Sequence, residues 1–152
     1  LSQGNNTKAA AAFAELDAKD PDVINAKGVI ALRKNDLSEA EALFRKSGTD
    51  DAKKNLGIVY ILTGQYEEAA RELADAKGCC HNTVLAYILT DQLDKAMSTA
   101  RCQDPKVWYL KAIVAARQGN QAQLRSFLER AYQNPFLKER AAKDIEFAGY
   151  EL

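Results

Sequence analysis

The sequence predicts an all-α protein built from consecutive antiparallel helix pairs, and three observations predict it. Helix-forming residues dominate the 152 residues, while the alternation of β-branched residues that marks strands is missing. Helix-breaking residues recur at short intervals, and the apolar residues between them repeat at spacings of three and four. The third observation is an internal repeat, which is clearest in residues 56–70, LGIVYILTGQYEEAA.

The repeat places small and turn-forming residues at fixed offsets. In residues 56–76, Gly57 lies on an expected first helix, Gly64 follows that helix, and Ala69 lies on the second helix. Spacing between equivalent positions runs from roughly 27 to 31 residues. In successive copies the turn position holds Asn35, Gly64, Asp91 and Gly119, and the small position of the first helix holds Gly28, Gly57 and Ala112.

These positions divide the chain into elements in order. We expect a half repeat over 1–20, with Gly4 in its turn, followed by complete repeats over 21–49 and 50–78. The repeat over 79–104 is the most degenerate, and a further repeat covers 105–135. A capping helix is expected over 136–149, because Leu137, Ala141 and Ile145 form an i, i+4, i+8 apolar stripe and Gly149 can end a helix.

Small residues have a physical role in such pairs. Two helices approach most closely where one has no side chain, so we expect Gly57 to contact Ala69, with Tyr60 and Tyr66 filling the volume beside it. Gly64 is expected to adopt a left-handed conformation that ends its helix. Because a single pair leaves one apolar face uncovered, the pairs are expected to stack into a solenoid.

The pattern resembles the tetratricopeptide repeat, whose signature combines W-x2-L-G-x2-Y with A-x3-F and a later Pro. The resemblance covers nearly the whole chain, although no single repeat matches every position and the repeats are shorter than the roughly 34 residues of the family. It implies a right-handed α-solenoid with a concave binding groove. The matching residues are Trp108, Leu56-Gly57, Tyr60, Ala40, Phe44, Pro21 and Pro135.

The N-terminal end is expected to be open. Residues 1–4 look like the last turn of a helix, and the face on which Ala9 and Phe13 would pack has no predicted cover. We expect the chain to be a fragment of a larger protein, and self-association through this face is the alternative.

Composition argues against two function classes. The 21 basic and 21 acidic residues cancel, whereas nucleic-acid-binding proteins normally carry a basic stripe. No window approaches 18 consecutive apolar residues, so no direct membrane insertion is expected.

Candidate chemistry is sparse. Cys79, Cys80 and Cys102 are odd in number and two are adjacent, so buried free thiols are expected in place of a disulfide framework. A metal, nucleophile or redox role for Cys79-Cys80-His81 is the alternative, but a zinc site needs a second ligand pair. Glu67 and Glu68 are expected to open a helix, where its dipole favours negative charge. The sequence therefore predicts a non-enzymatic protein without cofactor or metal.

The concave groove is the predicted binding surface, lined by the first helix of each pair. Apolar side chains one turn apart with scattered basic donors would suit an extended or helical peptide that carries hydrophobic anchors and a carboxylate; solvated or buried positions without a ligand are the alternative. In register, the groove residues are Asn25, Lys54, His81 and Tyr109, then Ile58 and Ile113 with Val29 and Leu85, then Arg33 and Arg117.

The family includes adaptors that clamp a C-terminal carboxylate with paired Lys and Asn side chains on adjacent repeats. Lys54 is placed like a clamp lysine, but its neighbour one turn on is Ile58 and not Asn, so this resemblance does not extend to a chaperone-tail clamp. The predicted function is a scaffold that binds a protein or peptide segment, and self-assembly is the alternative. The tail LKERAAKDIEFA is similar to endings of such arrays in bacterial cell-envelope proteins, which favours an envelope location, whereas free cysteines would favour the cytoplasm.

Overall fold

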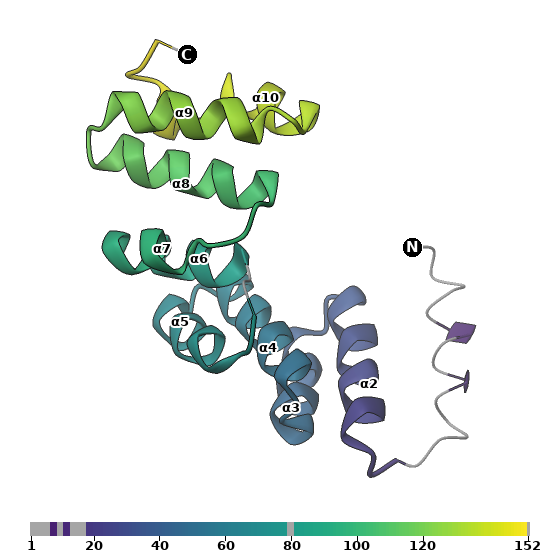
Figure 1. The fold of residues 1–152 in the computed structure, drawn as a ribbon. Coiled ribbons are helices and arrows are strands. Elements are labelled where there is room, and N and C mark those ends of the chain that lie inside the picture. Colours follow the sequence, from purple (N-terminus) through teal and green to yellow (C-terminus); the bar gives the residue numbers. More distant parts are fainter. Residues whose placement is uncertain (1–6, 9–10, 13–17, 79–80, 152) are drawn as a thin grey trace. The chain divides into compact units, whose positions relative to one another are not determined.

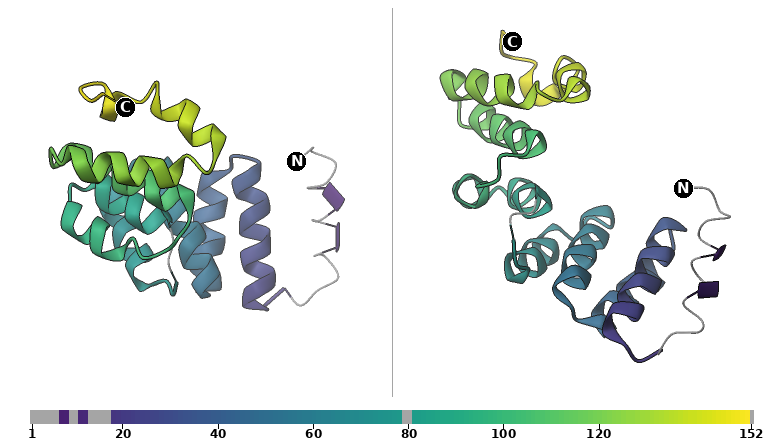
Figure 2. Two further views of the ribbon diagram at one scale, coloured as in Figure 1. Left: turned by 45° about the horizontal axis from the view of Figure 1, so that its top comes forward. Right: turned by 45° about the vertical axis from the view of Figure 1, so that its right-hand side comes forward.

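The computed structural model describes residues 7–8, 11–12, 18–78 and 81–151, and these residues are all-α, as predicted. Figures 1 and 2 show helices that follow one another in pairs, joined by short turns. No strand occurs among the described residues. The nine helices described are α2 (Pro21–Arg33), α3 (Leu37–Ser47), α4 (Asp50–Leu62), α5 (Tyr66–Asp75), α6 (His81–Leu89), α7 (Leu93–Thr99), α8 (Pro105–Arg117), α9 (Gln121–Ala131) and α10 (Pro135–Ala141), followed by the 3-10 helix η1 (Ile145–Phe147).

Two compact units make up the chain, Leu1–Lys77 and Gly78–Leu152. The first contains the α2/α3 and α4/α5 pairs, and the second contains the α6/α7 and α8/α9 pairs with α10 and η1. The division lies one residue before the predicted boundary between the repeats over 50–78 and 79–104. Most of the expected half repeat over 1–20, with Ala9 and Phe13, lies outside the described residues.

The same turn joins the two helices of all four pairs. One residue in each turn has a positive φ, and the N–H of the next residue donates to the carbonyl five positions earlier, with N···O distances of 2.8 or 2.9 Å. This geometry is the left-handed helix ending expected at Gly64 and Gly119. The four φ values are 63° at Asn35, 77° at Gly64, 56° at Asp91 and 69° at Gly119, which are the turn positions of the predicted repeat.

Close helix approach occurs at the predicted glycines but involves different partners. A Cβ on Gly57 would lie 2.4 Å from Cγ of Leu73, and one on Gly28 would lie 2.5 Å from Cε1 of Phe44. The atoms nearest to Gly57 thus belong to Leu73, a large residue one turn further along α5 than the expected Ala69. Tyr66 is also 38% exposed and does not fill the pair.

Side chains at the helix starts satisfy free backbone N–H groups, as expected for Asp, Asn and Thr at these positions. Asp104 accepts a hydrogen bond from the N–H of Lys106 at 2.7 Å, and Asn134 accepts one from Phe136 at 3.1 Å. In both helices a proline occupies the first turn, where its missing N–H costs nothing. Local sequence therefore fixes where α8 and α10 begin.

The capping helix ends much earlier than predicted. It stops at Ala141 and not at Gly149, and Ile145, the last residue of the predicted stripe, is 87% exposed. After a short turn, Asp144 caps η1 by accepting from the N–H of Glu146, and Phe147 is buried to 2% exposure. The chain leaves the helix because the turn brings Phe147, and not Ile145, onto the core.

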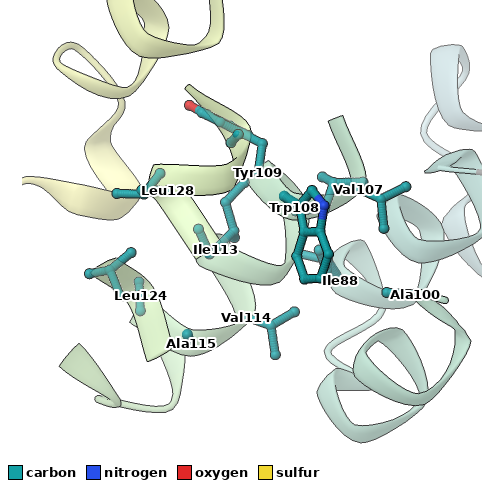
Figure 3. Packing of buried hydrophobic residues seen from close by; sticks show 14 of the residues in the cluster. Ile88, Ala100, Val107, Trp108, Tyr109, Ile113, Val114, Ala115, Leu124 and Leu128 are labelled. Carbon is teal, nitrogen blue, oxygen red and sulfur yellow. The ribbon is translucent and has the colours of Figure 1, made fainter. Parts of the chain in front are cut away.

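The core of the second unit is centred on α8. Leu124 and Leu128 of α9 lie on one side of the α8 side chains in Figure 3, and Ile88 and Ala100 lie on the other. Trp108, the single tryptophan of the chain, is buried at 7% exposure and stacks on Phe127 with ring centroids 5.7 Å apart. Its fluorescence is therefore a reporter of the folding of this unit.

Cys102 is disulfide-bonded, so the expectation of three free thiols is wrong. The other two cysteines, Cys79 and Cys80, lie outside the described residues. The odd number of cysteines argued against a disulfide framework, but three cysteines can still form one bridge and leave one free thiol. Their spacing in the sequence does not show whether such a bridge forms. Over the described ranges, no group of three or more metal-ligating side chains gathers, and no helix is both long and apolar enough to span a membrane.

Candidate functional site

A pocket of about 330 Å³ lies between α6, α8 and α10 in the second unit. It brings together three of the predicted groove residues, His81, Tyr109 and Ile113. We call it the α8 pocket. The other lining residues are Leu85, which the repeat register also places in the groove, and Lys106, Leu110, Asn134, Phe136, Leu137 and Arg140.

The floor of the α8 pocket is apolar. Leu110 and Ile113 of α8 are 9% and 8% exposed, and Leu137 of α10 is 6% exposed. Phe136, at the mouth, is 68% exposed, which is unusual for so large an apolar side chain. A ligand that covered Phe136 would remove this surface from water, at about 25 cal/mol per Å² of apolar area.

Only cationic and neutral side chains line the α8 pocket. Lys106 and Arg140 lie at its edge, and no Asp or Glu is among the lining residues that the structure describes. The pKa of His81 is lowered, first by burial and then by the nearby positive charge of Lys106, while Asp104 opposes this shift. The pocket can therefore hold an anionic group and would gain a further positive charge if His81 were protonated.

Tyr109 forms the wall between the pocket and the C-terminal residues. Its hydroxyl donates a hydrogen bond to Oδ2 of Asp144 at 2.5 Å, and its ring meets Phe147 edge-on, with centroids 5.6 Å apart. The guanidinium of Arg140 lies 5.6 Å from the ring centroid. Burial, followed by the hydrogen bond to Asp144, holds the pKa of Tyr109 well above its usual range. The residue therefore acts as a neutral donor.

Arg117 is directed to the C-terminal residues. Its Nε donates to both carboxylate oxygens of Glu146 at 3.1 and 3.0 Å, Nη2 completes the ion pair, and Nη1 donates to the carbonyl of Ile88 at 3.0 Å. The hydrogen bond to Glu146 is the main cause that raises the pKa of Arg117. The predicted basic donor thus already has an acidic partner within the chain.

The four predicted groove residues of the first unit have other surroundings. Asn25 accepts a hydrogen bond from Nδ2 of Asn55 at 3.0 Å, and Lys54 pairs with Asp51 at 3.1 Å. Ile58 is half-buried, and Arg33 is exposed. A hollow of about 240 Å³ in this unit is lined by other residues, namely Lys27, Ile30, Ala31, Lys34, Glu39 and Leu43.

Sequence reasoning missed the contribution of the C-terminal region to the site. Phe136 and Arg140 come from α10, which was assigned only a capping role, and Asp144 and Glu146 come from the segment after it. The Asn134-Pro135 helix start was a usable signal, because it fixes the register that turns Leu137 to the core and leaves Phe136 beside it. No sequence signal showed that residues 144–150 return to α8.

Comparison with known proteins adds no identification: no family model matches this chain, and no curated protein is significantly similar to it.

Proposed function

We propose that the chain is a non-enzymatic interaction scaffold of the tetratricopeptide-like class, with helix pairs stacked as a right-handed solenoid. The four equivalent turns support this architecture, because they recur at the predicted positions with the same φ sign and the same hydrogen bond. The close contacts at Gly28 and Gly57 support it as well, since both occur at equivalent places in their pairs.

The proposed activity is the binding of a peptide or protein segment at the α8 pocket. The observation that carries the proposal is the combination of an apolar floor, the exposed Phe136, and a rim with Lys106 and Arg140, of which Arg140 lies 4.0 Å from the carboxylate of Asp144 outside the lining. Such a site favours a segment that presents an apolar side chain next to an acidic one. The disulfide of Cys102 supports the expected cell-envelope location, because disulfides persist in oxidising compartments.

Peptide binding by matched variants tests this function. We would screen the chain against immobilised decapeptides of three kinds: acidic with apolar residues, basic with apolar residues, and acidic without apolar residues. The best binder would then be titrated by fluorescence anisotropy. We expect the first kind to bind, and Lys106→Glu/Arg140→Glu to weaken binding at least tenfold.

Lys138→Glu/Lys143→Glu is the control, because it makes the same charge change on exposed residues of the α10 region that do not line the pocket. Trp108 fluorescence and circular dichroism check that each variant folds. Equal weakening by the control would assign the binding to net charge alone, and no preference for acidic peptides with apolar residues would refute the proposal.

A further inference from the structure

Among the described residues, most side-chain contacts of the C-terminal residues 144–150 are with α8, and Asp144 also lies beside Arg140 of α10. Besides the bonds from Tyr109 to Asp144 and from Arg117 to Glu146, the hydroxyl of Tyr150 donates to the carbonyl of Ala116 at 2.6 Å. Phe147 is buried against the ring of Tyr109. The segment thus presents two carboxylates and two aromatic rings to α8, in the manner of a bound acidic peptide.

The segment shares residues with the proposed binding site. Tyr109 lines the α8 pocket and also donates to Asp144, and Arg140 lines the pocket while its Nε lies 4.0 Å from Oδ2 of Asp144. Tyr109 and Arg117 are two turns apart on α8, about 12 Å along the axis. A bound segment that extends from the pocket along α8 would therefore meet residues 144–150.

The attachment is suited to reversible release. The Arg117 and Glu146 side chains are 33% and 26% exposed, so solvent reaches their ion pair and screens it in part. Ile145 is 87% exposed and η1 has only three residues, so the apolar attachment of the segment rests on two side chains, Phe147 in the core around α8 and the partly buried Tyr150 beside it. Peripheral segments with few buried apolar contacts open locally at less cost than the core.

We propose that residues 144–150 occupy the surface of α8 formed by Tyr109, Ala116 and Arg117, which we call the α8 face, and that they compete there with partner segments of the same acidic and aromatic chemistry. This inference rests on the proposed function, since it describes how the binding site is regulated. Release of the segment frees Arg117 and Tyr109 as donors and uncovers the surface beneath Phe147. The apparent affinity of a partner is then lower than its affinity for the uncovered α8 face, by a factor equal to the fraction of molecules in which the segment is released.

The test adds the segment back as a separate molecule. The probe is a fluorescein-labelled octapeptide with the sequence of residues 144–151, DIEFAGYE, titrated against the full-length chain by anisotropy. In the variant Asp144→Asn/Glu146→Gln the internal segment keeps its shape but loses both carboxylates, whereas the probe retains its own. We expect the probe to bind this variant at least tenfold more tightly than it binds the native chain.

Glu129→Gln/Glu139→Gln is the matched control, with the same charge change at exposed positions, and should bind the probe like the native chain. If Asp144→Asn/Glu146→Gln does not fold, Tyr150→Phe removes only the hydrogen bond to Ala116 and should tighten probe binding by about twofold to fivefold. Hydrogen exchange of residues 144–150 should accelerate in the variants that bind the probe more tightly.

Equal affinity of the native chain and the variants for the probe would overturn the inference, as would failure of the probe to bind any of them. The pocket-binding decapeptide of the preceding section is titrated in parallel. Binding of the decapeptide without any effect of the segment variants would leave the proposed function standing and remove only this inference. If neither the native chain nor any variant binds the decapeptide, the proposed function itself is refuted.

Discussion

Replacing Gly57 with Ala should destabilise the first unit, although alanine is the better helix former. A Cβ at this position would lie 2.4, 2.6 and 2.9 Å from Cγ, Cδ2 and Cδ1 of Leu73, whereas carbon atoms in contact are about 3.5 to 4.0 Å apart. Leu73 is 1% exposed, so it cannot move out into solvent to make room. Overpacking of this kind costs about 1 to 3 kcal/mol. The gain in helix propensity offsets about 0.5 to 1 kcal/mol, so we expect a net loss of up to about 2.5 kcal/mol.

A double-mutant cycle with Leu73→Ala separates packing from propensity. Leu73→Ala alone should cost about 2 to 5 kcal/mol by leaving a cavity. In that background the added methyl of Gly57→Ala has room, so the substitution should become stabilising by about 0.5 to 1 kcal/mol. Urea unfolding followed by circular dichroism gives all four stabilities. Stabilisation by Gly57→Ala in both backgrounds would refute the close contact between Gly57 and Leu73. The larger substitution Gly57→Leu should lower the free energy of unfolding more than Gly57→Ala does.

Three further predictions concern the second unit. The pKa of Tyr109 is raised in the folded chain, so Tyr109 contributes its full stabilisation below about pH 10, and this contribution falls as the pH rises above that value, where unfolded tyrosine ionises. Urea melts followed by Trp108 fluorescence should show the loss of stability above about pH 10. The variant Tyr109→Phe should lose less stability over the same pH range. Because the pKa of His81 is lowered, its imidazole gains a positive charge only as the pH falls below about 6.5. An acidic peptide should therefore bind more tightly in this lower range, and anisotropy titrations of His81→Gln should lack the increase. Cys102→Ser should destabilise the unit by about 2 to 4 kcal/mol in the same melts, and added reductant should destabilise the native chain but not this variant.

Features of the fold that depend on local chemistry could be predicted from the sequence. The turn residues are an example: Gly64 and Gly119 can adopt positive φ without strain, and Asn35 and Asp91 tolerate it better than most residues. The starts of α8 and α10 follow equally from an Asp or Asn followed by Pro.

Features that depend on packing direction could not be predicted from spacing alone. Helical side chains tilt toward the N-terminus, so the residue that reaches a glycine on the facing helix is not the one at the same level; Leu73 fills the space that was assigned to Ala69. Similarly, the stripe of Leu137, Ala141 and Ile145 predicted a longer helix. The cap at Asp144 and the burial of Phe147 compete with that pattern and end the helix early.

The sequence pattern places some residues of the candidate site together and misses others. His81, Tyr109 and Ile113 meet in the α8 pocket because they occupy equivalent faces of α6 and α8, which the repeat register reveals. The carboxylates of Asp144 and Glu146 reach Tyr109 and Arg117 from about 30 residues away in the chain, through a turn that no sequence pattern marks.

Chemical-shift mapping is the most direct test of the central claim, that the α8 pocket binds an acidic peptide with an apolar residue. The ¹⁵N-labelled chain would be titrated with the best decapeptide from the screen, and the backbone amide shifts recorded by nuclear magnetic resonance. We expect the largest changes to cluster at His81, Leu85, Lys106, Phe136 and Arg140. Changes centred on the first unit or on the exposed side of α9, with these amides unmoved, would contradict it.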